Sequence, residues 1–293
     1  PSVAPENLKI IKWEASDYFI EARTLGARNV GIDAVEKYSR DAEVLYSALN
    51  NEDDPDYAPN NVRYQFYLAQ SYFDSQQWDK CIEAYEKRVE MGGWEEEIFF
   101  SKFRLAILSA IKQKPWPEVK EAYLEAWNYR PIRAEPLYEI SKMYRSMDKP
   151  RLAYLYSRIG VGINYPHSDI LFIAKDVYDW KMLDEFGSTA FYSGDLMNGI
   201  AACQKLLEEN KFSEEHRERI VQNHKAYQSQ IAQIQQEQVR LQQEHEVAMS
   251  AQREKEKEEK KKQKIEKQNV PKKPTKTKSP MKKGAKRKKK KKR

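Results

Sequence analysis

The chain has 293 residues, with 52 Lys and Arg against 45 Asp and Glu, and a formal net charge of +7. The basic excess lies at one end: residues 271–293 contain 14 Lys and Arg and no acidic residue, so residues 1–270 carry a net charge of −7. This distribution excludes a basic nucleic-acid-binding body. Ten glycines in the whole chain also disfavour a fold built around Gly-rich phosphate loops.

Residues 1–32 differ in character from the rest of the chain. The stretches 8–13 (LKIIKW) and 18–22 (YFIEA) are rich in β-prone residues and predict one or two short strands. Two short strands cannot bury a face alone, so we expect them to pack on the next helix or to be the edge of a domain that is absent from this chain. The N-terminus has neither an initiator Met nor the features of a signal peptide, which predicts a fragment or a processed product.

No apolar run is long enough to cross a bilayer, and the two cysteines lie far apart. Cys81 and Cys203 are therefore expected to be reduced, buried thiols. The expected location is the cytoplasm, with the nucleus as an alternative because of the basic end.

From residue 33 the apolar pattern becomes helical, and a helix–turn–helix unit recurs. Small residues stand at Ala69, Ser141 and Gly187, and each is followed by a second helix. The second helices share an anchor position, occupied by Cys81, Val119, Ala153 and Gly199 at spacings of 38, 34 and 46 residues. Small residues where paired helices cross are typical of tetratricopeptide repeats, whose period is 34 residues. The pattern predicts an all-α solenoid of degenerate tetratricopeptide-like hairpins over 33–212, with an insertion at 165–181.

A long charged helix is predicted over 213–270. Its apolar residues keep a strict spacing of seven, at Ile220, Tyr227, Ile234, Leu241 and Ala248. The companion positions are mostly polar (His224, Ile231, Gln238, His245), and a coiled coil needs both seams. Self-association through 213–252 and a solvated single helix therefore both stay open. Residues 271–293 are predicted to be a disordered Lys-rich tail.

Three stretches resemble a known family. They are 63–106, which contains Gly92-Gly93-Trp94, then 129–141, which contains Arg-Ala-Glu-Pro-Leu-Tyr, and 173–185. Over about 24–225 the chain resembles the helical region that follows the catalytic domain in tetratricopeptide-containing family 2 glycosyltransferases. The resemblance implies that the catalytic domain, with its nucleotide-sugar site and metal-binding Asp-x-Asp motif, is missing from this chain. It also implies that the chain is a non-catalytic accessory region that positions a partner or acceptor.

Motifs for chemistry are weak, and we expect no catalytic residue, metal or cofactor in this chain. Asp54-Pro55-Asp56 has the letters of an Asp-x-Asp motif, but it follows a helix in a loop rather than a buried strand. His245-Glu246 opens a metalloprotease pattern, yet Met249 stands where the second His belongs.

Two surfaces are candidates for binding. The first helix of each unit should line the concave face of the array, where a protein or peptide partner would bind. The candidate groove residues are Arg63, Phe66, Gln70, Phe73, Tyr138, Lys142, Arg145, Asp184, Ser188 and Tyr192. The second surface is the tail, a candidate for non-specific polyanion contact through Lys282, Lys283, Lys286, Arg287, Lys288, Lys289, Lys290, Lys291, Lys292 and Arg293. The alternatives to an accessory region are thus a free-standing peptide-binding scaffold and a polyanion-binding adaptor.

Overall fold

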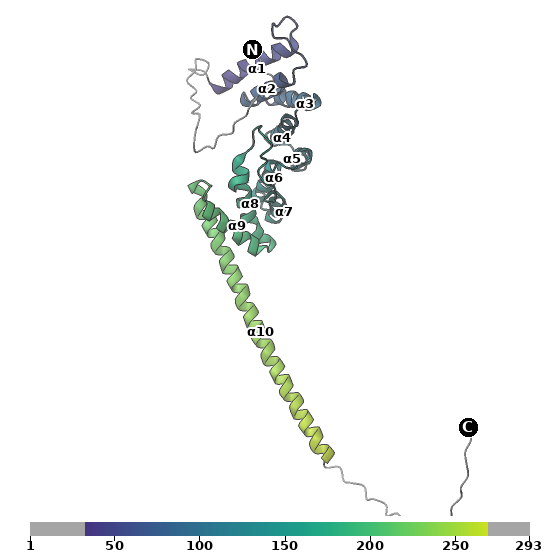
Figure 1. Cartoon of the computed structure of the whole chain (residues 1–293), viewed down its shortest axis with the longest axis vertical. Coiled ribbons are helices and arrows are strands. Elements are labelled where there is room, and N and C mark those ends of the chain that lie inside the picture. The colour runs from purple at the N-terminus through teal and green to yellow at the C-terminus, as the bar shows by residue number, and fades with distance from the viewer. Residues whose placement is uncertain (1–32, 269–293) are drawn as a thin grey trace, which may run out of the picture. The chain divides into compact units, whose positions relative to one another are not determined.

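The computed structural model describes residues 33–268, and within this range every regular element is a helix (Figure 1). The predicted all-α class is confirmed. The β-prone segment 1–32 and the Lys-rich tail 271–293 lie outside the described residues, so both remain predictions. No helix among the described residues contains a stretch long and apolar enough to cross a bilayer.

Helices pair in chain order, as the predicted hairpins require. A lone helix α1 (Ala34–Asn50) packs on the first of four hairpins. The hairpins are α2–α3 (Val62–Asp74, Trp78–Glu90), α4–α5 (Glu95–Ile111, Trp116–Tyr129), α6–α7 (Glu135–Ser146, Pro150–Gly160) and α8–α9 (Met182–Thr189, Leu196–Glu209). A π-helical turn, η3 (Val177–Lys181), leads into α8, and the 3₁₀ turn η4 (Ala190–Ser193) follows it. We call α2, α4, α6 and α8 the A helices.

Local sequence explains where these helices begin and end. The Asp33 carboxylate accepts a hydrogen bond from the Val35 amide, and the Asn61 side chain accepts from two amides of the first turn of α2. After α3 the backbone enters the left-handed region at Gly92 and Gly93, with φ of +66° and +91°. Only glycine adopts this conformation without strain, so the chain turns into α4 here.

The predicted small-residue phase is confirmed by the helix crossings. Ala69 and Ser141 are completely buried. The Cys81 Sγ lies 3.3 Å from the Ala69 carbonyl oxygen, and the Ser141 hydroxyl donates to the Ala153 carbonyl at 3.0 Å. At Gly187, an added Cβ would lie 3.2 Å from the Sγ of Cys203. A larger side chain at these positions would push the paired helices apart.

The last hairpin uses its small residues for two neighbours. An added Cβ at Gly199 would lie 2.2 Å from the hydroxyl oxygen of Tyr227, which belongs to α10 (Arg217–Gln268). The Tyr227 hydroxyl also donates to the Gly187 carbonyl at 2.9 Å. Ile220 and Tyr227 are almost completely buried, so the first turns of α10 belong to the packed body and extend it past residue 212.

The chain divides within α10 into two units, at residues 229 and 230. We call residues 33–229 the repeat body. In the second unit, Ile234 and Leu241 are 40% and 53% exposed, and Ala248 is exposed. Of the five apolar positions in the expected seam over 213–252, two are therefore occupied inside the repeat body. Self-association through the remainder stays a prediction.

Both cysteines are free and buried, as expected. Burial raises the pKa of the Cys81 thiol and of the Cys203 thiol to about 12 each. Both are therefore packing residues in the thiol form at neutral pH.

The crossing at Ala69 gives a stability prediction. Ala69→Leu should lower the free energy of unfolding by about 1–3 kcal/mol, because α3 leaves no room for a larger side chain. Urea unfolding followed by tryptophan fluorescence measures the change. Glu86→Leu, on the exposed side of α3, is the matched control and should change stability by no more than about 0.5 kcal/mol. An equal, small effect of both substitutions would contradict the assigned phase.

Candidate functional site

A segment of the chain between α7 and η3 packs against the A helices. The links from α3 to α4 and from α5 to α6 are short, but residues 161–176 separate α7 from η3. The predicted insertion is thus present, although its last part, 177–181, is helical. We call residues 164–174 the strap. It contacts α4 and α6, beside which it runs in Figure 1.

A buried ion network holds the strap. Asp169 is 4% exposed and accepts hydrogen bonds from Arg130 Nε at 2.8 Å and Arg133 Nη1 at 3.3 Å. Arg133 is 1% exposed, and its guanidinium also donates to both carboxylate oxygens of Glu135 and to the carbonyl oxygens of Leu171 and Phe172. Hydrogen bonds from the guanidinium of Arg130 hold the pKa of the Asp169 carboxyl below its ordinary value. The network fixes both the charge and the path of the strap.

The strap backbone is recognised as well. Glu96, in the first turn of α4, accepts hydrogen bonds from the amides of Ile170 and Leu171 at 2.8 and 2.7 Å. One carboxylate oxygen of Glu96 thus accepts hydrogen bonds from two consecutive backbone amides, in the place that a neighbouring strand would take in a sheet.

An aromatic ring of the strap, that of Phe172, also contacts the A helices. Phe172 lies with its ring centroid 4.9 Å from that of Phe100 on α4 and 6.4 Å from that of Phe66 on α2. Phe66 is consequently 1% exposed. Its expected exposure to a partner is wrong, because the chain supplies its own aromatic ring at this position.

The other candidate groove residue at the start of α2 is held by its neighbours. Arg63 pairs with the buried carboxylate of Glu97, which also accepts from the guanidinium of Arg88 at 2.8 Å. The Arg63 guanidinium lies 5.3 Å from the ring centroids of both Tyr67 and Trp94, and these two rings are 41% and 37% exposed.

In α6, the candidate groove residues Lys142 and Arg145 bind different internal partners. Both nitrogens of the Arg145 fork bind the buried Glu185 carboxylate of α8 at 2.7–3.1 Å. The Lys142 Nζ lies 2.6 Å from a Glu139 carboxylate oxygen and 5.4 Å from the ring centroid of Tyr138. Only Lys142, held by an exposed pair, is easily drawn to a partner.

The candidates in the last hairpin are covered by α10. Asp184 is 7% exposed and receives both arms of the Arg219 guanidinium, at 2.6 and 3.0 Å. The Ser188 hydroxyl accepts from Arg219 at 3.0 Å and from Asn223 at 3.3 Å. The expected exposure of Asp184 is also wrong, because the long helix begins on top of this hairpin. Tyr192 is 56% exposed, in the turn η4.

The remaining candidates, Gln70 and Phe73, lie on α2 facing α4. The Arg104 guanidinium of α4 lies 4.0 Å from the ring centroid of Phe73. The structure thus adds functional residues that sequence reasoning missed: Arg130, Arg133, Asp169 and Glu96 around the strap, and Arg104 beside it. The stretch 129–141 has a distinctive sequence, but no sequence pattern links it to Asp169.

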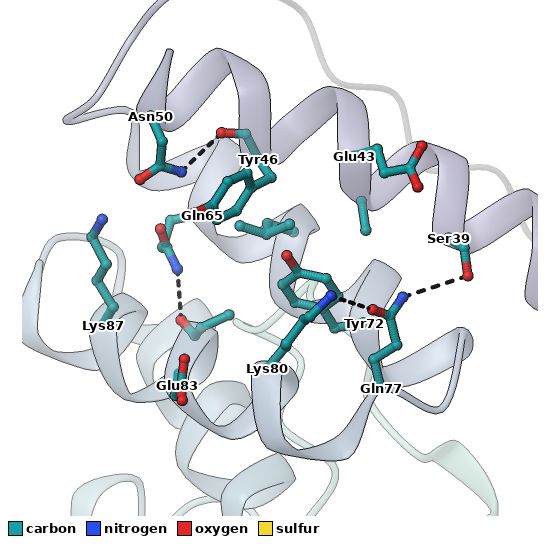
Figure 2. A pocket seen from close by; sticks show the side chains of 13 residues that line it. Ser39, Glu43, Tyr46, Asn50, Gln65, Tyr72, Gln77, Lys80, Glu83 and Lys87 are labelled. Carbon is teal, nitrogen blue, oxygen red and sulfur yellow. Dashed lines mark hydrogen bonds between the residues drawn. The ribbon is translucent and has the colours of Figure 1, made fainter.

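A separate hollow of about 500 Å³ lies between α1, α2 and α3 (Figure 2). Some of its polar side chains are bound internally: Lys80 donates to Gln77 at 2.9 Å, and Gln65 donates to the backbone carbonyl of Ala84 at 2.9 Å. Glu43 and Glu83 line it together with Lys80 and Lys87. The balance of acids and bases gives this hollow no preference for a ligand of either charge.

No protein-family profile and no curated protein sequence matches this chain. Among solved structures, the crystal structure of MamA is similar, with a TM-score of 0.41 and 17% sequence identity. The match covers 62% of this chain and 97% of MamA. Neither partner nor activity is inferred from this similarity.

The ion network gives a pH-dependent prediction. Asp169→Asn should lower the free energy of unfolding at neutral pH by about 3–5 kcal/mol, because it leaves buried guanidinium charge under-compensated. The Asp169 pKa is depressed in the folded protein, so its contribution is present above the unfolded pKa of about 3.9 and is lost as the pH falls through the lower folded value.

Urea unfolding of the original chain and of Asp169→Asn should therefore show a gap that is constant near neutral pH and narrows below about pH 4. Asp53→Asn, in the exposed loop after α1, is the control and should show no such gap. A gap that does not change with pH would mean that the Asp169 charge has no role in holding the strap.

Proposed function

We propose that the repeat body is a protein-interaction scaffold that binds an extended polypeptide segment along its A helices. The strap is the observation that carries this proposal. Side chains of α4, of α6 and of the turn between α5 and α6 already hold a non-helical stretch of chain through its backbone amides, a carboxylate and an aromatic ring. These are the contacts with which a groove recognises a peptide in general.

The part of the face beyond the strap is available to a partner. Tyr67 on α2 is 41% exposed, and Lys142 on α6 is exposed and held only by a surface ion pair. Solenoid repeats present such a face on a rigid scaffold, so binding of a partner does not lose free energy to ordering of the receptor.

A peptide selection tests this proposal. The full chain should enrich binding sequences from a displayed library of random peptides. Tyr67→Ala combined with Lys142→Glu should weaken binding of the enriched peptides by about thirtyfold, since each substitution removes a contact of roughly 1 kcal/mol. The control is Leu155→Ala with Met197→Ala, two exposed residues of α7 and α9, which should leave affinity unchanged. Equal affinity in both double variants would place binding elsewhere.

A finer form of the proposal makes the body the non-catalytic accessory region of a glycosyltransferase-like protein. The resemblance of 63–106 and 129–141 supports it. The most distinctive letters of these stretches, Arg133-Ala-Glu-Pro-Leu-Tyr138 and Gly92-Gly93-Trp94, correspond to the strap network and to the turn between α3 and α4. The residues of these two motifs thus fix one particular arrangement of the helical array.

The non-catalytic role predicts that this chain, incubated with nucleotide sugars and Mn²⁺ or Mg²⁺, releases no nucleotide above the blank. Asp54 accepts a hydrogen bond from the Asp56 amide within its own loop, an arrangement typical of a surface turn. Nucleotide release can be followed by chromatography. Turnover that disappears in Asp54→Ala would contradict both the accessory role and the reading of this loop.

A further inference from the structure

Arg104 lacks the partner that comparable arginines of the body have. The other arginines that are partly or fully buried each bind a carboxylate: Arg88, Arg130, Arg133, Arg217 and Arg219. Arg104 is also partly buried, yet among residues 33–268 its guanidinium is found in no hydrogen bond and no ion pair. Its contacts are with aromatic rings, at 4.0 Å from the centroid of Phe73 and 4.9 Å from that of Phe100.

Two rings hold this guanidinium in place. Stacking on aromatic faces fixes the plane of the group while its N–H donors, at the edge of that plane, stay free. Phe100 contacts Phe172 of the strap as well as Arg104. Arg104 and Phe172 of the strap thus share one contact ring, that of Phe100.

Two more polar groups in this region lack a partner. Gln70 Nε2 and Tyr85 Oη are buried, and neither makes a hydrogen bond to any described residue. Gln70 is one helical turn from Phe66 and one from Phe73 along α2, and these two residues contact Phe100 and Arg104 of α4. The charge of Arg104 opposes the rise that burial causes in the Tyr85 pKa, so the hydroxyl is within its field. Buried donors without acceptors are costly, and an acceptor ligand would relieve that cost.

We propose that Arg104, assisted by Gln70, binds a carboxylate of the extended polypeptide partner, immediately beyond Phe172 of the strap. This inference rests on the proposed function and names the chemistry of its ligand. The cluster supplies donors and one positive charge, and a carboxylate is an acceptor-only group whose two oxygens fit the guanidinium fork.

Neighbouring charge favours a carboxylate over a phosphate. The Asp74 carboxylate is within the field of Arg104, and Lys37 of α1 also acts on Asp74. Asp74 thus offsets part of the positive charge that Arg104 brings to this region. A monoanion is matched by this charge, whereas a phosphate group carries about two negative charges at neutral pH.

The first test is a titration of the full chain, labelled with ¹⁵N-arginine, with sodium acetate. The Nε–Hε resonance that is missing in Arg104→Lys identifies Arg104. We expect a saturable shift of this resonance with acetate, a weaker response to inorganic phosphate and none to chloride at equal ionic strength. The exposed, paired Arg40 serves as the internal control. No saturable acetate shift, or a stronger response to phosphate, would overturn the site.

The second test compares peptide selection on the original chain and on Arg104→Met, which keeps the length of the side chain on the rings. The original chain should enrich an acidic residue or a free C-terminal carboxylate at one position, and Arg104→Met should lose that preference and bind those peptides about tenfold more weakly. Arg104→Lys should bind them at an intermediate level, because it keeps the charge but loses the fork.

Thermal unfolding establishes whether each variant is folded. If one of them is not, Gln70→Leu takes its place in the comparison, and it should also weaken the binding of acidic peptides. An acid preference that persists in the variants would overturn the proposal. An acetate shift without any peptide binding would overturn the polypeptide partner and with it the proposed function, while leaving Arg104 as a carboxylate receptor.

Discussion

The path of the strap along the A helices depends on one buried guanidinium, that of Arg133. A charge removed from water costs several kcal/mol unless its hydrogen bonds are replaced, and here they are replaced by two carboxylates and two strap carbonyls, with the ring of Phe99 at 4.6 Å. Asp169, Leu171 and Phe172 can satisfy Arg133 only if the strap follows its observed path. The cost of leaving this charge unpaired therefore keeps the strap on the A helices.

This constraint also decides how much of the face a partner can use. The strap covers Phe66 and Phe100 and engages the start of α4, while Arg219 of α10 covers Asp184 and Ser188 at the other end. Beside the first of these covers, Arg104 contacts Phe73 and Phe100, and it makes no hydrogen bond or ion pair to a carboxylate among residues 33–268. Arg133 shows what a satisfied guanidinium looks like in this fold, and this contrast is the basis for proposing Arg104 as a carboxylate receptor.

The sequence predicted what depends on neighbours along the chain. Ala69, Ser141 and Gly187 were assigned to the helix crossings because small residues recur at a fixed place in each hairpin, and they lie there. The strap network could not be predicted, since Asp169 meets Arg130 across 39 residues and Arg133 across 36, and an insertion carries no periodicity to show which face it will cover. Phe66 and Asp184 were placed on the right helices, but the segments that bury them come from distant parts of the chain.

The spacing of seven in α10 shows how one pattern can serve two environments. Ile220 and Tyr227 continue the phase of Ile234, Leu241 and Ala248, yet the first two pack in the repeat body, where Tyr227 fills the space left by Gly199. Only three positions of that seam then remain for a second copy, and their companions are mostly polar. A coiled coil needs apolar residues in both seams over three to four heptads. We therefore place the proposed recognition on the A-helix face, where Arg104 makes no hydrogen bond or ion pair to any residue of 33–268, rather than on the long helix.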